Sequence, residues 1–216
     1  MNRKVVVILS GGPDSVTLLY YIKSEGFDVN AISFKYGQIA EKEVNIAKKI
    51  CENIRVPVRI VDLSSLNEIY RDATGLCNRG IAIPGTFEKS VIVPFRNAVF
   101  LSVAVSYAEV IGAEHVFYGA QGSDAPFYPD CRKEFFEAFQ NAARQGTGSK
   151  INIDAPFHKL QKADIIKLAS RLRVPIEKTW SCYLDGEKHC GKCESCINRK
   201  KAFTEAGVSD PAPYET

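Results

Sequence analysis

Apolar and polar positions follow two different rhythms along the first sixty residues. Residues 4–9 (KVVVIL) form a short continuous apolar run, rich in β-branched side chains, that stops at a Ser-Gly-Gly turn. Such a run predicts a strand that is buried on both faces of a parallel sheet. Residues 27–37 and 56–63 are also interpreted as strands, so we expect three strands in this part of the chain.

Helical spacing separates these strands. We expect one helix from Pro13 onward and a second over residues 41–54. The apolar face of the second consists of Val44, Ala47, Ile50 and Cys51. Strands that alternate with helices predict a parallel sheet, because each crossover needs a helix to return the chain to the same edge. The expected fold class is therefore α/β, with a doubly wound parallel sheet.

The pattern becomes irregular over residues 64–89 and regular again afterwards. The irregular stretch carries several glycines and a proline, and loops this long in a compact domain are usually functional or disordered. A polar turn at residues 121–130 interrupts the second regular part. The elements expected there are helices over residues 97–111, 131–146 and 161–172, and strands over residues 114–120 and 150–156.

Composition places the chain among folded globular proteins. Of its 216 residues, 45% are hydrophobic and 25% charged, and the net charge is only +3. No polybasic tract points to a nucleic-acid partner. The amino-terminal apolar run is too short for a signal peptide, and no other run approaches the roughly 18 apolar residues of a membrane helix. We therefore expect a cytoplasmic protein with no membrane partner.

The turn after the first strand is the first candidate site. Glycine pairs let backbone N–H groups converge, and the following helix presents its positive end to an anion such as a phosphate chain. A carboxylate at Asp14 would repel phosphates unless a cation lies between, so we expect Asp14 to help hold Mg²⁺. The structural alternative is that the turn only connects a strand to a helix and binds no ligand. The candidate segment comprises Leu9, Ser10, Gly11, Gly12, Pro13, Asp14, Ser15, Val16, Thr17, Leu18 and Leu19.

This turn matches neither the Walker A pattern, whose lysine is absent, nor G-x-G-x-x-G. "SGGPDS" resembles the PP-loop of the N-type ATP pyrophosphatases. The resemblance implies that ATP is cleaved between its α and β phosphates, and that a substrate oxygen is adenylated on the way.

A cysteine cluster near the carboxyl end is the second candidate site. Four of the seven cysteines are spaced C-x7-C-x2-C-x2-C, namely Cys182, Cys190, Cys193 and Cys196. Four thiolates suit a closed structural Zn²⁺ site, and backbone amides of a C-G-x-C turn can point at the sulfurs. An iron–sulfur cluster or redox-active thiols are the alternatives, and His189 is expected to be a bystander. We divide the chain into an ATP-binding α/β domain over residues 1–180 and a small zinc-binding segment over residues 181–216.

Further motifs between the two sites point to one family. "YGQ" with Glu43, "VPFRN", "SDAPFYPDCR", "LQKAD", "TWSCY" and "CGKCESC" follow "SGGPDS" in order. The chain resembles the 7-cyano-7-deazaguanine synthase family. The resemblance implies conversion of 7-carboxy-7-deazaguanine, ammonia and ATP to the nitrile preQ0, for queuosine or archaeosine biosynthesis. It also implies a homodimer that acts on small molecules without binding nucleic acid, and free ammonia as nitrogen donor.

The motifs supply candidate residues for this chemistry. The proposed catalytic set is Asp14, Arg96, Asp124 and Lys162, with the two cations placed to stabilise charge on the α-phosphate. The proposed substrate-binding set is Asn97, Tyr128, Asp130 and Arg132. Structural alternatives are that Arg96 starts a helix, that Lys162 is a solvated first-turn lysine, and that Asp130 caps a helix beginning at Cys131. Cys131 is not expected to be a nucleophile, since adenylation requires no thiolate.

The chain departs from the family pattern at three positions. Phe95 precedes Arg-Asn where a small residue is usual, and Ile39 and Ala40 follow "YGQ" where Arg-His is common. Phe95 could narrow the pocket or pack against the core. Two rival functions are another PP-loop enzyme that modifies tRNA and a non-enzymatic zinc module that binds nucleotides.

Overall fold

A central parallel sheet organises the chain in the computed structural model, which describes residues 3–215. The strand order is β3-β2-β1-β4-β5, and every neighbouring pair is parallel. The strands are β1 (Lys4–Ile8), β2 (Asp28–Lys35), β3 (Val58–Asp62), β4 (His115–Phe117) and β5 (Asn152–Asp154). The predicted parallel sheet is therefore confirmed.

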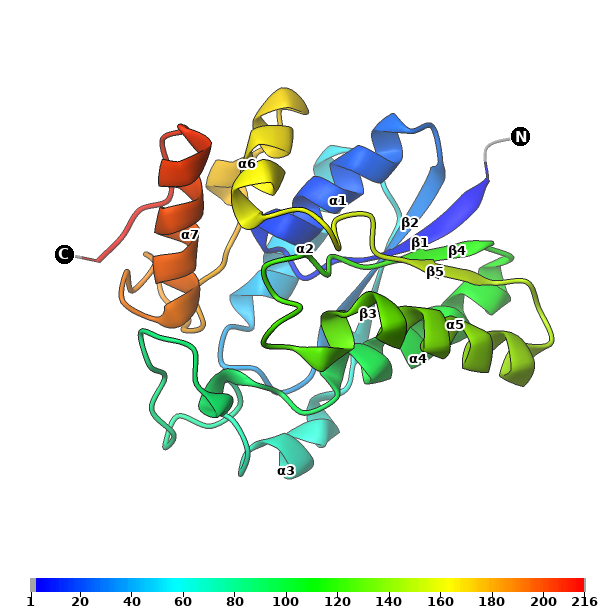
Figure 1. Cartoon of the computed structure of the whole chain (residues 1–216), viewed down its shortest axis with the longest axis horizontal. Helices are drawn as coiled ribbons and strands as arrows, with labels where there is room; N and C mark the ends of the chain where they lie inside the picture. The colour runs from blue at the N-terminus through cyan, green and yellow to red at the C-terminus, as the bar shows by residue number, and fades with distance from the viewer. Residues whose placement is uncertain (1–2, 216) are drawn as a thin grey trace.

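Helices cover both faces of this sheet (Figure 1). One face is covered by α1 (Pro13–Ser24), α2 (Lys42–Asn53) and α6 (Lys162–Arg171), and the other by α4 (Arg96–Ile111) and α5 (Lys133–Thr147). A short helix, α3 (Asn67–Tyr70), lies in the irregular segment, and α7 (Glu194–Ala206) packs against α6.

The alternation of side chains along β1 divides the core in two. Val5 and Val7 belong to the hydrophobic cluster beneath α1, whereas Val6 belongs to the cluster beneath α4 and α5. Successive side chains of a strand point to opposite faces, so a continuous apolar run feeds both cores at once. This is the physical reason why residues 4–9 lack alternation, and the doubly wound prediction is confirmed.

The segment Lys89–Ile111 corrects one expectation. It meets the length and composition test of a membrane-spanning helix, with mean hydropathy 1.5, although the sequence analysis expected no such run. Leu101, Ala104 and Ala108 of α4 are buried in the cluster against β1 and β4. A helix that packs closely against a sheet acquires the same composition, so core packing accounts for its hydropathy.

The carboxyl-terminal segment is tied to the body by more than its cysteines. Ala202 and Phe203 of α7 enter the same hydrophobic cluster as α1. Arg199 is 1% exposed, and its guanidinium lies 2.9 Å from Asp210 and donates to the Thr179 hydroxyl at 3.1 Å. Helix α7 was not among the predicted elements, and the division of the chain at residue 180 stays a prediction.

Strand order places the candidate site. The chain moves outward from β1 to β2 and β3, then returns to the other side of β1 for β4 and β5. The loops after β1 and β4 therefore diverge and leave a crevice at the carboxyl ends of these strands. The "SGGPDS" turn and the polar turn at residues 121–130 flank this crevice.

Candidate active site

The glycine turn passes close beneath α2. Gly11 has φ +92°, and a Cβ there would lie 2.4 Å from the carbonyl oxygen of Glu43. Both the left-handed backbone and this close approach require glycine. The Ser10 and Ser15 hydroxyls lie 2.9 Å apart, and α1 starts at Pro13. The turn thus presents hydroxyls and a helix amino terminus to the crevice, as predicted for a phosphate-binding loop.

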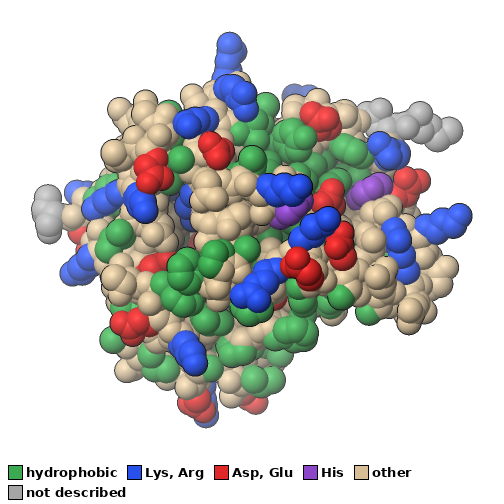
Figure 2. Space-filling view, in the orientation of Figure 1, with side chains coloured by type: hydrophobic (Ala, Val, Ile, Leu, Met, Phe, Trp, Pro, Cys, Tyr) green, Lys and Arg blue, Asp and Glu red, His purple; other side chains and the backbone are tan. Residues whose placement is uncertain are grey.

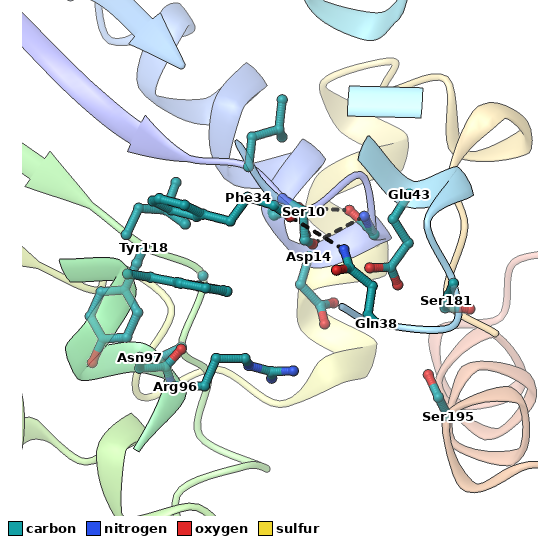
Figure 3. A pocket seen from close by; sticks show the side chains of 18 of the residues that line it. Ser10, Asp14, Phe34, Gln38, Glu43, Arg96, Asn97, Tyr118, Ser181 and Ser195 are labelled. Carbon is teal, nitrogen blue, oxygen red and sulfur yellow. Dashed lines mark hydrogen bonds between the residues drawn. The ribbon is translucent and has the colours of Figure 1, made fainter. Parts of the chain in front are cut away.

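A cavity of about 270 Å³ opens from this turn. Its apolar part is formed by Ile8, Phe34, Phe100 and Tyr118, with the Phe34 and Phe100 rings stacked at 4.3 Å. Figure 3 shows Asp14 and Arg96 pointing into the same space, and Ser195 of α7 facing it from the side opposite Tyr118. A hollow is visible between α7 and α6 on the molecular surface (Figure 2).

Only the first half of the predicted loop segment lines the cavity. Leu9, Ser10, Gly12, Pro13, Asp14 and Ser15 contribute to its wall. Val16, Leu18 and Leu19 are fully buried in the core, and the Thr17 hydroxyl donates to the Pro13 carbonyl at 2.7 Å. These four residues of α1 support the turn from behind, so their side chains are not part of the candidate ligand site.

Asp14 and Lys162 meet across the cavity. The Lys162 ammonium, on the first residue of α6, lies 3.2 Å from one carboxylate oxygen of Asp14. The other oxygen, Oδ1, is buried and has no hydrogen-bond partner among the described residues. Burial lowers the pKa of Lys162, but the carboxylates of Asp14 and Asp124 outweigh it and raise that pKa. Lys162 is therefore a fixed cation rather than a solvated surface lysine.

Asp124 belongs to the same group of charges. Gln121 Nε2 donates to its Oδ1 at 3.0 Å. Burial raises the pKa of Asp124 to about 6, while the nearby Lys162 ammonium opposes the shift. The structure thus brings together three of the four predicted catalytic residues around one end of the cavity.

Arg96 starts a helix and also lines the cavity. It is the first residue of α4, and its guanidinium turns into the cavity, where it donates to the Tyr36 hydroxyl at 3.0 Å. Burial lowers the pKa of Arg96, but the opposing effect of Tyr36 and Asp130 is larger and raises the pKa above its ordinary value. The guanidinium therefore stays cationic.

Asp130 caps a helix, but not the expected one. Its Oδ2 accepts the backbone N–H of Asn97 at 3.1 Å, in the first turn of α4. The helix that follows Asp130 starts at Lys133 with Arg132 at its N-cap, so the alternative of a helix beginning at Cys131 is wrong. The backbone N–H groups in the first turn of a helix have no partner within the helix. By accepting one of them, Asp130 links the turn at residues 121–130 to the start of α4 at the cavity edge.

The remaining substrate-binding candidates differ in position. Asn97, Tyr128 and Asp130 line a smaller adjoining cavity, whereas Arg132 lines neither. The guanidinium of Arg132 instead donates to the Ala125 carbonyl at 2.9 Å on the surface. Cys131 is buried, and burial raises its thiol pKa, which agrees with the expectation of an inert thiol.

Phe95 neither narrows the pocket nor packs in the core. Its side chain is 66% exposed and lines neither cavity. Its φ of 57° lies in the left-handed region, a backbone conformation that favours glycine over a residue with a large side chain. Both interpretations offered for Phe95 are therefore wrong. Ala40, another position at which the chain departs from the family pattern, does line the cavity.

The four clustered cysteines form a metal-binding geometry. Their Sγ atoms all lie within 4.8 Å of one another, with Cys182 to Cys193 at 4.0 Å and Cys190 to Cys196 at 3.9 Å. Tetrahedral Zn²⁺ with Zn–S bonds of about 2.3 Å requires sulfurs about 3.8 Å apart. The four cysteines are buried and unoxidised. The donor set therefore fits Zn²⁺.

Backbone amides support the sulfurs as predicted. Cys193 N–H points at Cys190 Sγ at 3.3 Å, and Leu184 N–H points at Cys182 Sγ at 3.4 Å. Such contacts stabilise thiolates. His189 packs against Trp180 with the two rings tilted and their centroids 4.2 Å apart, and its Nε2 accepts the Ser181 N–H. It therefore lies outside the ligand set.

Comparison with known proteins gives this geometry a family. The family described as "Queuosine biosynthesis protein QueC" matches residues 4–207. The chain belongs to the QueC family. It is 44% identical to the 7-cyano-7-deazaguanine synthase of Caldicellulosiruptor saccharolyticus, covering 98% of this chain and 96% of that one. The enzyme of the same name from Thermoplasma acidophilum is also 44% identical, over 99% and 93%.

A more distant likeness concerns the fold alone. The solved structure of the NH3-dependent NAD synthetase from Campylobacter jejuni superposes with a TM-score of 0.54 at 16% identity, covering 82% of this chain and 69% of that one. The QueC family chain thus has the fold class expected from its PP-loop.

Glu43 is a cavity residue to which the sequence analysis gave no role. It lies four residues before Ala47 and seven before Ile50, so it continues the buried face of α2 toward the cavity. Burial raises the pKa of Glu43 to about 8, and Arg96 opposes the shift. The sequence signal that could have identified Glu43 is a charged residue at a position that belongs to the apolar face of a helix.

We expect Glu43→Gln to change how stability depends on pH. Because the folded pKa of Glu43 lies above its ordinary value of 4.5, this group lowers the free energy of unfolding as pH rises from about 4.5 to about 8. The glutamine variant lacks this loss. Its free energy of unfolding, compared with that of the parent protein, should therefore be on the order of 2 kcal/mol more favourable at pH 8 than at pH 5. Urea unfolding at the two pH values, at constant metal content, measures this.

The exposed Glu25→Gln variant provides the control and should show no such gain. Equal pH dependence in the Glu43 variant and the parent protein would contradict the raised pKa.

Proposed function

We propose that this QueC family protein is a cytoplasmic 7-cyano-7-deazaguanine synthase that converts 7-carboxy-7-deazaguanine and ammonia to the nitrile preQ0 through adenylated intermediates. The observation that carries the proposal is the convergence of Asp14, Lys162 and Arg96 on one cavity at the PP-loop. The relatives named above, which span nearly the whole chain, support the substrate assignment.

The two parts of the cavity suit the two parts of ATP. The rings of Phe34, Phe100 and Tyr118 offer an apolar wall to the adenine. The hydroxyls of Ser10 and Ser15 and the amino terminus of α1 face the phosphates and would hold the departing pyrophosphate.

Asp14 fits a site for Mg²⁺. Its buried and unpartnered Oδ1 is an oxygen ligand of the kind that Mg²⁺ prefers, and Lys162 already neutralises the other oxygen. When bound, Mg²⁺ would neutralise charge on the pyrophosphate. Lys162 and Arg96 line the same cavity and would stabilise the negative charge that increases on the α-phosphate during attack.

The chemistry then needs two adenylations. A carboxylate oxygen of the substrate attacks the α-phosphorus of ATP, and pyrophosphate leaves. Ammonia attacks the acyl carbon, AMP leaves with that oxygen, and loss of a proton gives the amide. The amide oxygen attacks the α-phosphorus of a second ATP, and a second pyrophosphate leaves. Departure of the second AMP, with loss of two protons from nitrogen over these steps, gives the nitrile. Both carboxylate oxygens thus end in AMP.

The other assignments follow from the family resemblance. We propose that free ammonia is the nitrogen donor, that the protein is a homodimer acting without nucleic acid, and that Zn²⁺ bound by the four cysteines is structural. In this scheme residues 1–180 bind ATP, and the zinc-binding segment, residues 181–216, closes one side of the cavity with Ser195.

Incubation with substrate labelled with ¹⁸O in its carboxylate, ATP, Mg²⁺ and ammonia tests the proposal. Mass spectrometry should find preQ0 and two labelled AMP molecules for each nitrile. Label in inorganic phosphate, with ADP as the nucleotide product, would refute the adenylation route. Absence of any nitrile, together with modification of added tRNA, would favour the rival PP-loop function.

A further inference from the structure

A second, smaller cavity adjoins the ATP cavity. It measures about 130 Å³ and is lined by polar residues from α4, the loop after β4, α6 and α7. Arg96, Lys162 and Asp124 belong to the walls of both cavities. A molecule in the smaller cavity could therefore contact the two cations as well as α7.

Glu194 lines this cavity from the start of α7. It is the first residue of α7 and only 9% exposed. Its Oε2 accepts the Tyr183 hydroxyl at 2.7 Å, and its Oε1 accepts the side-chain amide of Asn198. These two donors fix the plane and direction of the carboxylate.

The carboxylate retains capacity for a ligand. Each carboxylate oxygen has two acceptor positions, and one hydrogen bond to each oxygen is already made within the protein. A pair of parallel N–H donors on a planar ligand can occupy the other two. The other carboxylates of this cavity have different duties, since Asp130 caps α4 and Asp124 faces Lys162.

The deazaguanine ring carries such a pair of donors. Its N1–H and 2-amino groups lie side by side at the end of the bicycle opposite C7, where the reacting carboxylate is attached. With this edge at Glu194, the 7-carboxylate would point toward Arg96 and Lys162. An adenine ring has an unprotonated N1 that would repel the carboxylate, so the same residue would keep ATP out of this cavity.

We propose that Glu194 is a specificity-determining residue that binds the N1–H and 2-amino edge of the deazaguanine ring in the smaller cavity. This rests on the proposed function for the identity of the substrate. It also gives the metal cluster a positioning role, since Cys193 immediately precedes Glu194 and Cys196 lies two residues after it. The metal site would thus fix the start of α7 and, with it, the substrate-reading carboxylate.

Calorimetric titration with two ligands tests the proposal. The ligands are 7-carboxy-7-deazaguanine and the matching 7-deazahypoxanthine carboxylate, which lacks only the 2-amino group. The parent protein should bind the first at least about tenfold more tightly, because loss of the 2-amino group leaves a buried acceptor unpaired. Glu194→Gln should bind the first ligand about 10- to 100-fold more weakly and discriminate between the two much less.

Glu205→Gln, on the exposed part of the same helix, is the matched control and should behave as the parent protein. In turnover, Glu194→Gln should raise KM for the deazaguanine substrate and leave KM for ATP unchanged, with one equivalent of metal retained. Equal affinity of the parent protein for the two ligands would overturn the proposal, whether or not the variant folds. So would unchanged discrimination in Glu194→Gln.

The ligand arm and the nitrile assay fail separately. Nitrile formation without discrimination at the 2-amino group would refute the role of Glu194 and leave the proposed function intact. Discrimination at the 2-amino group without nitrile formation would refute the proposed function and leave the role of Glu194 in binding intact.

Discussion

Replacement of Asp14 by asparagine is expected to reduce nitrile formation by about 10³-fold or more while the fold is retained. The carboxylate is the one acidic group of the PP-loop turn, and its free Oδ1 is the proposed ligand for Mg²⁺. An amide of the same shape removes the negative charge that attracts the cation and leaves Lys162 without its partner. Losses of this size are typical when a group acts on charge in the transition state.

The measurement is the rate of AMP and preQ0 formation, with circular dichroism to follow the fold. Asp72→Asn is the control, since Asp72 is exposed and far along the chain from the cavity residues. Retention of more than about a tenth of the parent rate in Asp14→Asn would remove Asp14 from a metal-binding role.

Local pattern was sufficient for most of the sheet and for the PP-loop. Residues 4–9 were found because a strand buried on both faces is a continuous apolar run. Val44, Ala47, Ile50 and Cys51 were found from the helical periodicity of the face that α2 buries. Asp14 and the four cysteines were found because each motif is contiguous or nearly so, and its chemistry is carried by neighbouring residues.

Features that depend on contacts between distant segments were not predictable in this way. Asp130 caps α4 from 33 residues away, so its sequence neighbours suggested the wrong helix. Phe95 was assigned to a pocket or a core because size suggests burial, whereas a left-handed backbone at the start of α4 directs it to solvent. Glu194 received no role because the cysteine on each side dominated the interpretation of its segment.

Replacement of Cys193 by alanine should release the metal and lower stability by several kcal/mol. Cys193 contributes one of four thiolates, so only three of the four ligands would remain in the alanine variant. The free energy of binding a structural Zn²⁺ is folding free energy, and its loss costs on the order of 5 kcal/mol or more. Metal analysis and thermal unfolding measure both effects.

Cys77→Ala supplies the matched control, because Cys77 is a buried cysteine outside the metal cluster. It should retain one equivalent of metal and lose only the roughly 1 kcal/mol typical of a small core truncation. Unchanged metal content and melting temperature in Cys193→Ala would contradict a structural metal site. Because Glu194 follows Cys193 directly, the folded fraction of Cys193→Ala should also bind the deazaguanine substrate more weakly than Cys77→Ala, while its affinity for ATP should change less.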